Sequence, residues 1–521
     1  MARKKLRTEQ KQEVKNGVRR LIFAALGMTI QILYLVFFLL RLGQRVTWLS
    51  GLVNLLALFL VLMIYVKESN AGFKMPWIIL IAAFPLIGVV VYALMGQRNA
   101  TRATRRRFNE INEALQPILM QDVRAAQELD AMHAHAVGIA HYLHATCGYP
   151  VYKNTKVEYY DDGAKGLEAQ LAEMRKAQSF IFLEYHAIED GSASFDRIKE
   201  VLAEKAKEGV EVRLFYDEVG SIGFINRDFV KRMEALGIKT RIFNPVMPAV
   251  AVFMNNRDHR KITVIDGKIA FTGGYNLADE YFNITSPYGH WKDCGIRMEG
   301  DAVRTMTTLF LEMWNAINKK DEDDVSYEKF YPETDFHTDE AGFVQPFADS
   351  PLDLEPTGEN VYMAIANNAT KYLYFSTPYL ILTDEFSRAI AFAAERGIDV
   401  RIVTPGIPDK KITYRLTRSY YAPLVKKGVR IYEYTPGICH AKLCLSDDEI
   451  ATVGTINLDY RSLYLHFENG VVLYDKPAIK DIYADFQTLF EKSEEVTCKY
   501  SHGSTPLRIG YSLLRLLSPL M

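Results

Sequence analysis

The octapeptide H-R-K-I-T-V-I-D, His259 to Asp266, returns in this chain of 521 residues as H-A-K-L-C-L-S-D, His440 to Asp447. In both copies, the Lys follows the His by two positions and the Asp follows it by seven. With 11 His in the chain, one such match would arise by chance in roughly 4% of chains of this composition. The match extends further along the chain, to a Gly and an Asn in each copy: Gly273 and Asn276, then Gly454 and Asn457. The matched copies therefore indicate an internal repeat.

The sequence around each copy has the order strand, helix ending in Gly, strand. Aromatic and apolar residues of Ser179 to Ile188 and of Lys371 to Leu380 predict buried strands, and a helical pattern follows each of them. Alternation of this kind predicts the α/β class, as two tandem α/β sheet units related by a pseudo-twofold axis. We place the units at residues 147–318 and 344–521, with a polar surface linker at 319–343.

The first 107 residues differ in character, because they contain three apolar segments, 21–40, 49–66 and 75–95. A helix of about 20 residues spans about 30 Å, the thickness of a hydrocarbon core, so each segment predicts a transmembrane helix. Basic residues before the first segment and in Arg98 to Arg107 favour the cytoplasmic side for both ends. Two full crossings satisfy this rule and three do not, so the number of crossings stays open. Residues 108–146 predict a helical linker to the α/β units.

Composition excludes several other classes of protein. The net charge is −1, and no basic patch accompanies the repeat, which argues against nucleic acid as a partner. The five Cys are scattered, with no C-x-x-C pair, which predicts free thiols and no zinc site. No His or carboxylate stands at metal-ligand spacing beside His259 or His440, so we expect no metal and no cofactor.

The repeated residues suit chemistry on a phosphodiester. Side chains alternate along a strand, so His259 and Lys261 are expected on one face. Two facing halves supply two Lys and two Asn to hold phosphate oxygens, and two His on opposite sides of the phosphorus. One neutral imidazole attacks, and the other, protonated, gives its proton to the leaving alcohol. Asp266 precedes a Gly at a turn and is expected to fix the local structure, as is Asp447.

Two further carboxylates occupy matching places in the repeat. Asp293 stands two residues before Gly295, and Glu468 stands two residues before Gly470. We expect them to hold the second nitrogen of the two catalytic imidazoles and to set their tautomers. His290 and His466 lack counterparts in the repeat and are interpreted as ordinary polar residues.

These motifs resemble the duplicated HKD motif of the phospholipase D superfamily, and within it the bacterial cardiolipin synthases. The narrower resemblance rests on F-K-M-P-W-I-I-L-I-A-A-F-P-L-I-G, N-L-D-Y-R-S-L and the tail L-L-R-L-L-S-P-L-M. It implies condensation of two phosphatidylglycerol molecules to cardiolipin and glycerol, without a metal. We therefore expect a multi-pass protein of the bacterial cell membrane, and the basic residues that flank the apolar segments favour a cytoplasmic catalytic part. The chain departs from the usual pattern at Asp258, where Asn is common, and in the polar residues around Asp447.

The resemblance also implies roles for individual residues. His259 is assigned as nucleophile and His440 as acid and base, although the reverse order stays open. The implied catalytic set is His259, Lys261, Asp266, His440, Lys442 and Asp447, and the implied phosphate-binding set is Lys261, Asn276, Lys442 and Asn457.

Several rival functions use the same site. A hydrolytic phospholipase D or another phosphatidyltransferase differs only in the acceptor that discharges the intermediate. A membrane-tethered nuclease is disfavoured by the charge, and an inactive scaffold by the intact motifs. The second lipid, phosphatidylglycerol or phosphatidylethanolamine, and a homo-oligomeric state are left open. The expected partners are phosphatidylglycerol and the lipid bilayer.

Overall fold

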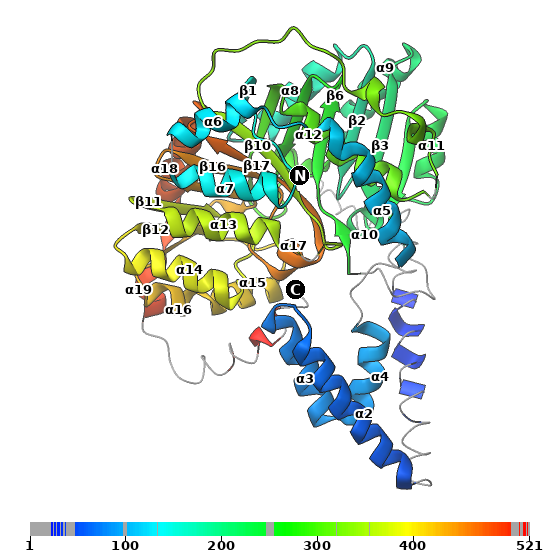
Figure 1. Cartoon of the computed structure of the whole chain (residues 1–521), viewed down its shortest axis with the longest axis vertical. Helices are drawn as coiled ribbons and strands as arrows, with labels where there is room; N and C mark the ends of the chain where they lie inside the picture. The colour runs from blue at the N-terminus through cyan, green and yellow to red at the C-terminus, as the bar shows by residue number, and fades with distance from the viewer. Residues whose placement is uncertain are drawn as a thin grey trace, which may run out of the picture.

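Figure 1 shows the computed structural model, in which a large α/β body lies above a smaller group of N-terminal helices. The structure describes residues 47–96, 102–132, 134–245, 255–318, 320–353 and 355–501, together with single positions between 22 and 37 and between 510 and 518. The predicted apolar segment 21–40 is therefore described only in short, interrupted stretches, and its remaining positions lie outside the described residues.

The other two apolar segments form three helices: α2 (Thr47–Val66), α3 (Ala71–Ala83) and α4 (Pro85–Met95). The predicted segment 75–95 is broken at Phe84, because Pro85 has no N–H to donate and its ring clashes with the preceding turn. The chain folds back there, and a Cβ at Gly88 would stand 2.5 Å from Ile81 Cα. Among the described residues, we find no helix with both the length and the apolar character needed to cross a membrane. The predicted transmembrane spans are thus not confirmed.

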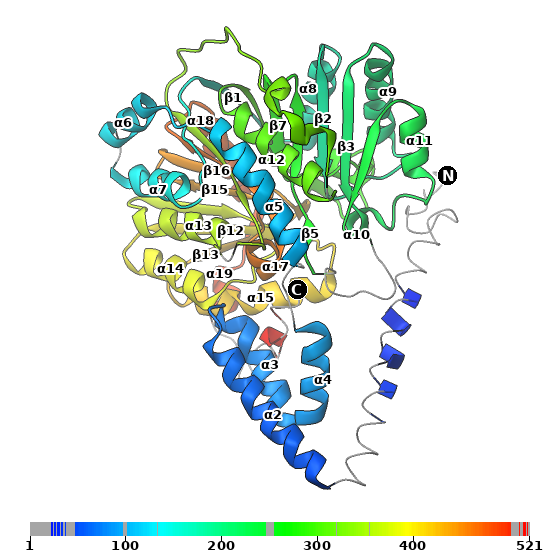
Figure 2. The ribbon, with the colours of Figure 1, turned by 45° about the vertical axis from the view of Figure 1, so that its right-hand side comes forward.

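Two sheets of the same design form the large body (Figure 2). The first has the order β1-β9-β7-β6-β2-β3-β4, and the second has the order β10-β17-β16-β15-β11-β12-β13-β18. In each sheet, three neighbouring strands are parallel to one another and lie beside a group of antiparallel strands. The parallel strands are β2, β3 and β4 in the first sheet, and they correspond to β11, β12 and β13 in the second. The predicted α/β fold with tandem sheet units is confirmed.

The strands of the first sheet are β1 (Thr155–Tyr160), β2 (Phe180–Tyr185), β3 (Glu211–Asp217), β4 (Lys239–Phe243), β6 (Lys261–Ile265), β7 (Ile269–Gly273) and β9 (Gly295–Gly300). Those of the second are β10 (Phe343–Asp349), β11 (Tyr372–Ser376), β12 (Asp399–Pro405), β13 (Arg430–Tyr434), β15 (Leu443–Ser446), β16 (Ile450–Gly454), β17 (His466–Tyr474) and β18 (Ser493–Glu495).

Helices cover both sheets, and two of them end as the sequence predicted. After α9 (Ala193–Lys207) and α14 (Asp384–Glu395), Gly209 and Gly397 take φ values of +91°, which the absence of a Cβ permits. The helices of the first half are α8 (Gly163–Met174), α9 (Ala193–Lys207), α10 (Glu218–Ser221), α11 (Phe229–Ala235) and α12 (Val303–Ala316). Those of the second are α13 (Thr357–Asn368), α14 (Asp384–Glu395), α15 (Lys411–Ser419), α16 (Tyr421–Val425), α17 (Tyr460–Tyr464), α18 (Ala478–Glu491) and α19 (Thr497–Ser501).

One hydrophobic core joins the halves. Helix α12 is buried along nearly its whole length, and its residues pack in one cluster with Phe182 of the first sheet and Val344 of the second. Burial of this extent makes the halves one unit, because separating them would expose the apolar side chains of α12 to water.

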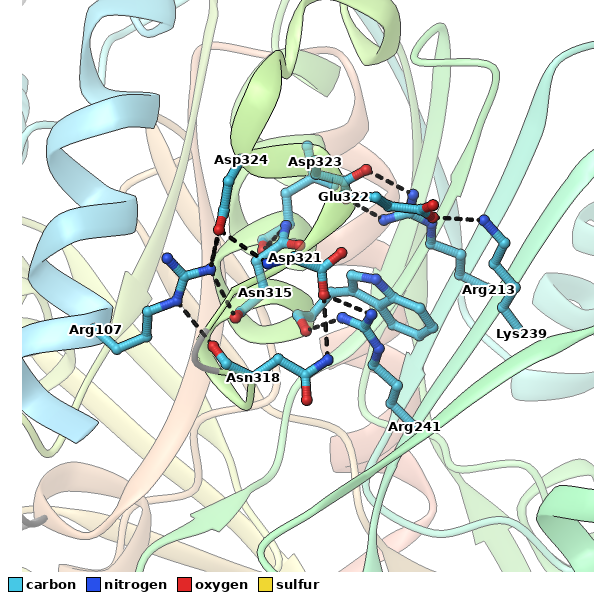
Figure 3. Close-up of polar contacts among 12 residues, drawn as sticks. Arg107, Arg213, Lys239, Arg241, Asn315, Asn318, Asp321, Glu322, Asp323 and Asp324 are labelled. Atoms are coloured by element: carbon cyan, nitrogen blue, oxygen red, sulfur yellow. Dashed lines mark hydrogen bonds and ion pairs between the residues drawn. The ribbon is translucent and has the colours of Figure 1, made fainter. Parts of the chain in front are cut away.

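Two segments connect the parts of the chain. Residues 108–146 contain the end of α5 (Arg102–Leu115), α6 (Val123–Met132) and α7 (Ala134–Ala145). The polar linker at 319–343 begins with an acidic turn whose carboxylates bind basic side chains of α5, β3 and β4 (Figure 3). In particular, Asp323 and Arg213 are both fully buried and form an ion pair of 2.5 Å. Further ion pairs of this turn are Arg107–Asp324, Lys239–Glu322, Arg241–Asp321 and Lys329–Asp323.

Candidate active site

Each motif His is carried on a strand segment that pairs with the opposite half. The short strand β5 (Arg257–Asp258) pairs with the start of β17, and the His259 N–H donates to the Phe467 carbonyl at 2.8 Å. Likewise, β14 (Gly437–Cys439) pairs with β8 (His290–Lys292), and the His440 N–H donates to the Lys292 carbonyl at 2.7 Å. The sequence placed His and Lys on one strand. That placement is corrected here, because each strand proper, β6 or β15, begins only after its His.

This strand pairing between the halves brings each imidazole next to a carboxylate of the other half. His259 Nδ1 lies 2.9 Å from both carboxylate oxygens of Glu468, and His440 Nδ1 lies 2.8 Å from Asp293 Oδ2. Both carboxylates are fully buried. Because Nδ1 is engaged in each ring, Nε2 is the nitrogen left for chemistry.

Neighbouring groups hold the two carboxylates. The Thr455 hydroxyl donates to Glu468 at 2.5 Å, and the Trp291 indole N–H donates to Asp293 at 3.3 Å. Gly274 stands against Asp293, where a Cβ would come within 2.1 Å of Oδ1. The first repeat needs Gly at this point because the carboxylate occupies the space of a side chain.

The motif lysines lie beside the two histidines, and the motif asparagines are buried. Both lysines are buried, and each Nζ donates to the carbonyl of the His two residues earlier, at 2.7 Å in the case of Lys261. Lys442 Nζ also lies 3.0 Å from His440 Nε2. Asn276 donates from its amide to the Tyr281 hydroxyl at 2.9 Å, whereas the buried Asn457 Oδ1 has no hydrogen-bond partner among the described residues.

Burial sets the charge of the imidazoles and the lysines. It lowers the pKa of His259 well below its usual value and that of His440 to about 4, and in both cases the nearby Lys ammonium acts in the same direction. Burial also lowers the pKa of Lys261 to about 7 and that of Lys442 to about 8. A neutral His259 is a competent nucleophile at pH 7, and both lysines change charge near that pH.

The pKa values of the two carboxylates are shifted in opposite directions. Burial raises the pKa of Glu468 well above its usual value. The pKa of Asp293 is lowered, because the effects of His440 and Lys442 together outweigh that of burial. An ionised Asp293 stabilises an imidazolium at His440, which suits that ring for proton transfer.

Asp266 and Asp447 do not take part in this cluster. Asp266 accepts hydrogen bonds from the backbone N–H groups of residues 178, 179 and 180, and Asp447 accepts from those of residues 370, 371 and 372. Each stands at the far end of its strand, seven residues and about 23 Å of extended chain from the His. A catalytic role for these two residues is therefore corrected to the structural one that their turn position predicted.

Further rings, from residues outside the repeat pattern, lie next to the two imidazoles. The rings of His186 and His466 lie 4.9 Å and 5.6 Å from the His259 ring, and the Tyr281 ring lies 5.5 Å from that of His440. From the sequence, His466 was interpreted as an ordinary polar residue because it has no counterpart in the first copy. Its position two residues before Glu468, on the same face of β17, was the available signal.

Three of these side chains also have the chemistry of a metal-ligand set. Ligand atoms of His259, His466 and Glu468 lie within 4.8 Å of one another, a proximity that spacing along the sequence did not reveal. His and Glu together are ligands typical of zinc. However, Glu468 already accepts hydrogen bonds here, and the ammonium groups of Lys261 and Lys442 oppose a cation.

Comparison with known protein families identifies the two halves and part of the N-terminal region. A family model described as "Cardiolipin synthase, PLD-like domain" matches residues 171–314 and 362–490, and one described as "Phospholipase_D-nuclease N-terminal" matches residues 52–97.

Relatives that match over most of their length occur in bacteria. A cardiolipin synthase of Halalkalibacterium halodurans is 31% identical over 475 residues, which cover 91% of this chain and 93% of that protein. An uncharacterized protein of Streptococcus mutans is 44% identical over 422 residues, which cover 81% of this chain and 90% of that protein. Among solved structures, the phosphatidylserine synthase of Haemophilus influenzae superposes with a TM-score of 0.54 at 14% identity, over 70% of this chain and 95% of that one. This last likeness concerns the fold alone.

Proposed function

Because the chain belongs to the cardiolipin synthases with phospholipase D-like domains, we propose that it transfers a phosphatidyl group between two phosphatidylglycerol molecules. The products are cardiolipin and glycerol. The observation that carries the proposal is the crossed pair of imidazoles and carboxylates, one pair on each side of the junction between the halves.

In the first step, His259 Nε2 attacks the phosphorus of one phosphatidylglycerol. The P–O bond to the glycerol headgroup breaks, and His440 Nε2 gives its proton to the departing oxygen. The imidazolium at His440 is stabilised by Asp293 and by the negative charge of the bound phosphate. The phosphatidyl group is then held on His259 by a P–N bond.

In the second step, a headgroup hydroxyl of another phosphatidylglycerol enters along the same path. His440 Nε2 takes its proton, the hydroxyl oxygen bonds to phosphorus, and the P–N bond to His259 breaks. Lys261 and Lys442 hold the phosphate oxygens in both steps, together with the amides of Asn276 and Asn457. Glu468 and Asp293 act as positioning residues through the two rings.

Association with a membrane fits this substrate, because a diacyl lipid leaves a bilayer only at a cost of about 0.8 kcal/mol per methylene group. Helices α2 to α4 expose many large apolar side chains, as a membrane-bound surface does. The bundle is attached beside the site, since Phe73 of α3 packs edge to face on Tyr460 and Tyr464 of α17, just after Asn457. The exposed side chains include Trp48, Leu52, Leu55, Leu58, Phe59, Leu62, Val66, Met75, Ile79, Phe84 and Ile87.

The test uses the full chain in detergent with phosphatidylglycerol as the only lipid. We expect cardiolipin and glycerol in equal amounts. Phosphatidic acid without cardiolipin would instead indicate a hydrolase, and absence of any product would overturn the proposal. His259→Ala and His440→Ala should abolish turnover, whereas His337→Ala, whose side chain is 78% exposed, serves as the matched control.

A further inference from the structure

A small surface on the second half combines basic and apolar side chains at the rim of the site. Residues 407–415 expose Ile407, Lys410, Lys411, Ile412 and Arg415, which we call the basic apolar face. Ile412 is 59% exposed and Ile407 is 42% exposed, whereas Tyr414 and Leu416 of the same helix, α15, are buried. No ion pair within the described part of the chain engages Lys411 or Arg415. An exposed apolar pair among unpaired cations is typical of an interfacial segment at a lipid surface.

This face is tied to the two site segments of the second half. At its start, the Ile407 N–H donates to the Gly437 carbonyl at 3.0 Å, on the strand that leads to His440. Further along α15, the Thr417 hydroxyl accepts from the Leu380 N–H at 3.1 Å. Ile381, which follows Leu380, donates its N–H to the carbonyl of Leu458, and Leu458 is the neighbour of Asn457.

The acidic residue within the segment is turned to the protein. Asp409 accepts a hydrogen bond of 2.5 Å from the Tyr379 hydroxyl, and Lys410 lies over the Tyr379 ring. The charge left for solvent is therefore positive. Both ribbon views place α15 at the end of the body that faces α3 and α4, the helices with exposed apolar side chains (Figures 1 and 2). Basic charge beside exposed isoleucines on this side matches an anionic bilayer.

We propose that the basic apolar face docks on the headgroup region of an anionic bilayer and so sets the mouth of the active site at the lipid surface. This inference rests on the proposed function, since phosphatidylglycerol is both substrate and anionic lipid. The helices α2 to α4 keep the body near the membrane, whereas the face on α15 orients it.

The test compares two forms of the substrate with the full chain. Turnover is measured on vesicles of phosphatidylcholine with a minor fraction of phosphatidylglycerol, and on short-chain phosphatidylglycerol below its critical micelle concentration. For Lys411→Glu with Arg415→Glu, we expect a loss of about tenfold or more on vesicles and no loss on the short-chain lipid. Ile412→Ser should lose about fivefold on vesicles, through the apolar surface that no longer inserts. The matched control is Lys207→Glu with Lys231→Glu, exposed charges on α9 and α11.

A second readout separates docking from a general structural effect. Added salt should lower the vesicle rate of the wild-type protein and of the control, but hardly that of the charge-reversed variant, because salt screens the attraction that the variant has already lost. Equal rates of variant and wild type on vesicles, or an equal loss on both substrates, would overturn the docking proposal. If the wild-type protein turned over neither substrate, the proposed function itself would fail.

Discussion

The substitution Asp293→Asn tests the crossed arrangement most directly, because it removes a charge from one half that acts on the histidine of the other. The carboxylate is fully buried and lies 2.8 Å from His440 Nδ1. Asn keeps the size and an oxygen that can accept from His440 and Trp291, so the substitution removes the charge and the second acceptor, which the Cys294 N–H uses at Oδ1. A carboxylate and an imidazolium at about 4 Å interact by about 4 kcal/mol at an effective dielectric constant of 20. If about 3 kcal/mol of this is expressed in the transition state, kcat falls about 100-fold.

The assay is the initial rate of cardiolipin formation in mixed micelles as a function of pH. Asp293 raises the pKa of His440, so its replacement should lower that pKa further below about 4. The pH limb that requires a protonated His440 should therefore move to lower pH in the variant. The matched control is Asp323→Asn, which removes another fully buried carboxylate, one that pairs with Arg213 in the linker network. This control should lower the melting temperature while the folded protein keeps its kcat.

The reasoning is refuted if folded Asp293→Asn protein keeps a kcat within about threefold of the wild type. A large loss with an unmoved pH limb would also refute it, since the carboxylate would then act on something other than His440.

Three further predictions concern other parts of the site. Asp266→Ala or Asp447→Ala leaves three backbone N–H groups without their acceptor, and should lower the free energy of unfolding by about 2–3 kcal/mol in denaturant melts. The folded fraction should keep its kcat, and a loss of kcat without a loss of stability would restore the two residues to the catalytic set. With the pKa of Lys261 at about 7 and that of Lys442 at about 8, kcat/KM should fall as pH rises through this range, because the ammonium groups that attract phosphate lose their protons. Initial rates that stay level to about pH 9 would contradict this. Gly274→Ala places a Cβ 2.1 Å from Asp293 Oδ1 and should reduce kcat about as much as Asp293→Asn, whereas Gly138→Ala, with open space around it, should have no effect.

Local patterns were enough to predict most of the α/β body. Apolar and aromatic residues at 179–188 became β2, and glycines at 209 and 397 ended helices because only a residue without Cβ accepts φ near +90° cheaply. The turn position of Asp266 correctly predicted that its carboxylate would cap neighbouring backbone. Each of these signals lies within a few residues of the structure that it predicts.

The features that the sequence did not reveal depend on contacts between distant residues. His259 and Glu468 are 209 positions apart, and the pairing of β5 with β17 that joins them follows no periodicity. The repeat indicated that Asp293 and Glu468 are equivalent, but not that each serves the opposite copy. His466 was missed because a search for matched positions ignores a residue present in only one copy. The sequence predicted a surface linker at the acidic turn 321–324. Its ion pairs could not be predicted, because their basic partners come from three separate elements.

The exchange of carboxylates between the copies also constrains how such a protein can change over evolutionary time. A duplicated unit is normally free to decay in one copy while the other keeps working. If the two carboxylates act as proposed, a lesion at position 293 impairs the ring at 440 and one at 468 impairs the ring at 259, so that each copy depends on the other. A substitution in either copy is therefore expected to impair the site as a whole, and neither copy is a spare for the other.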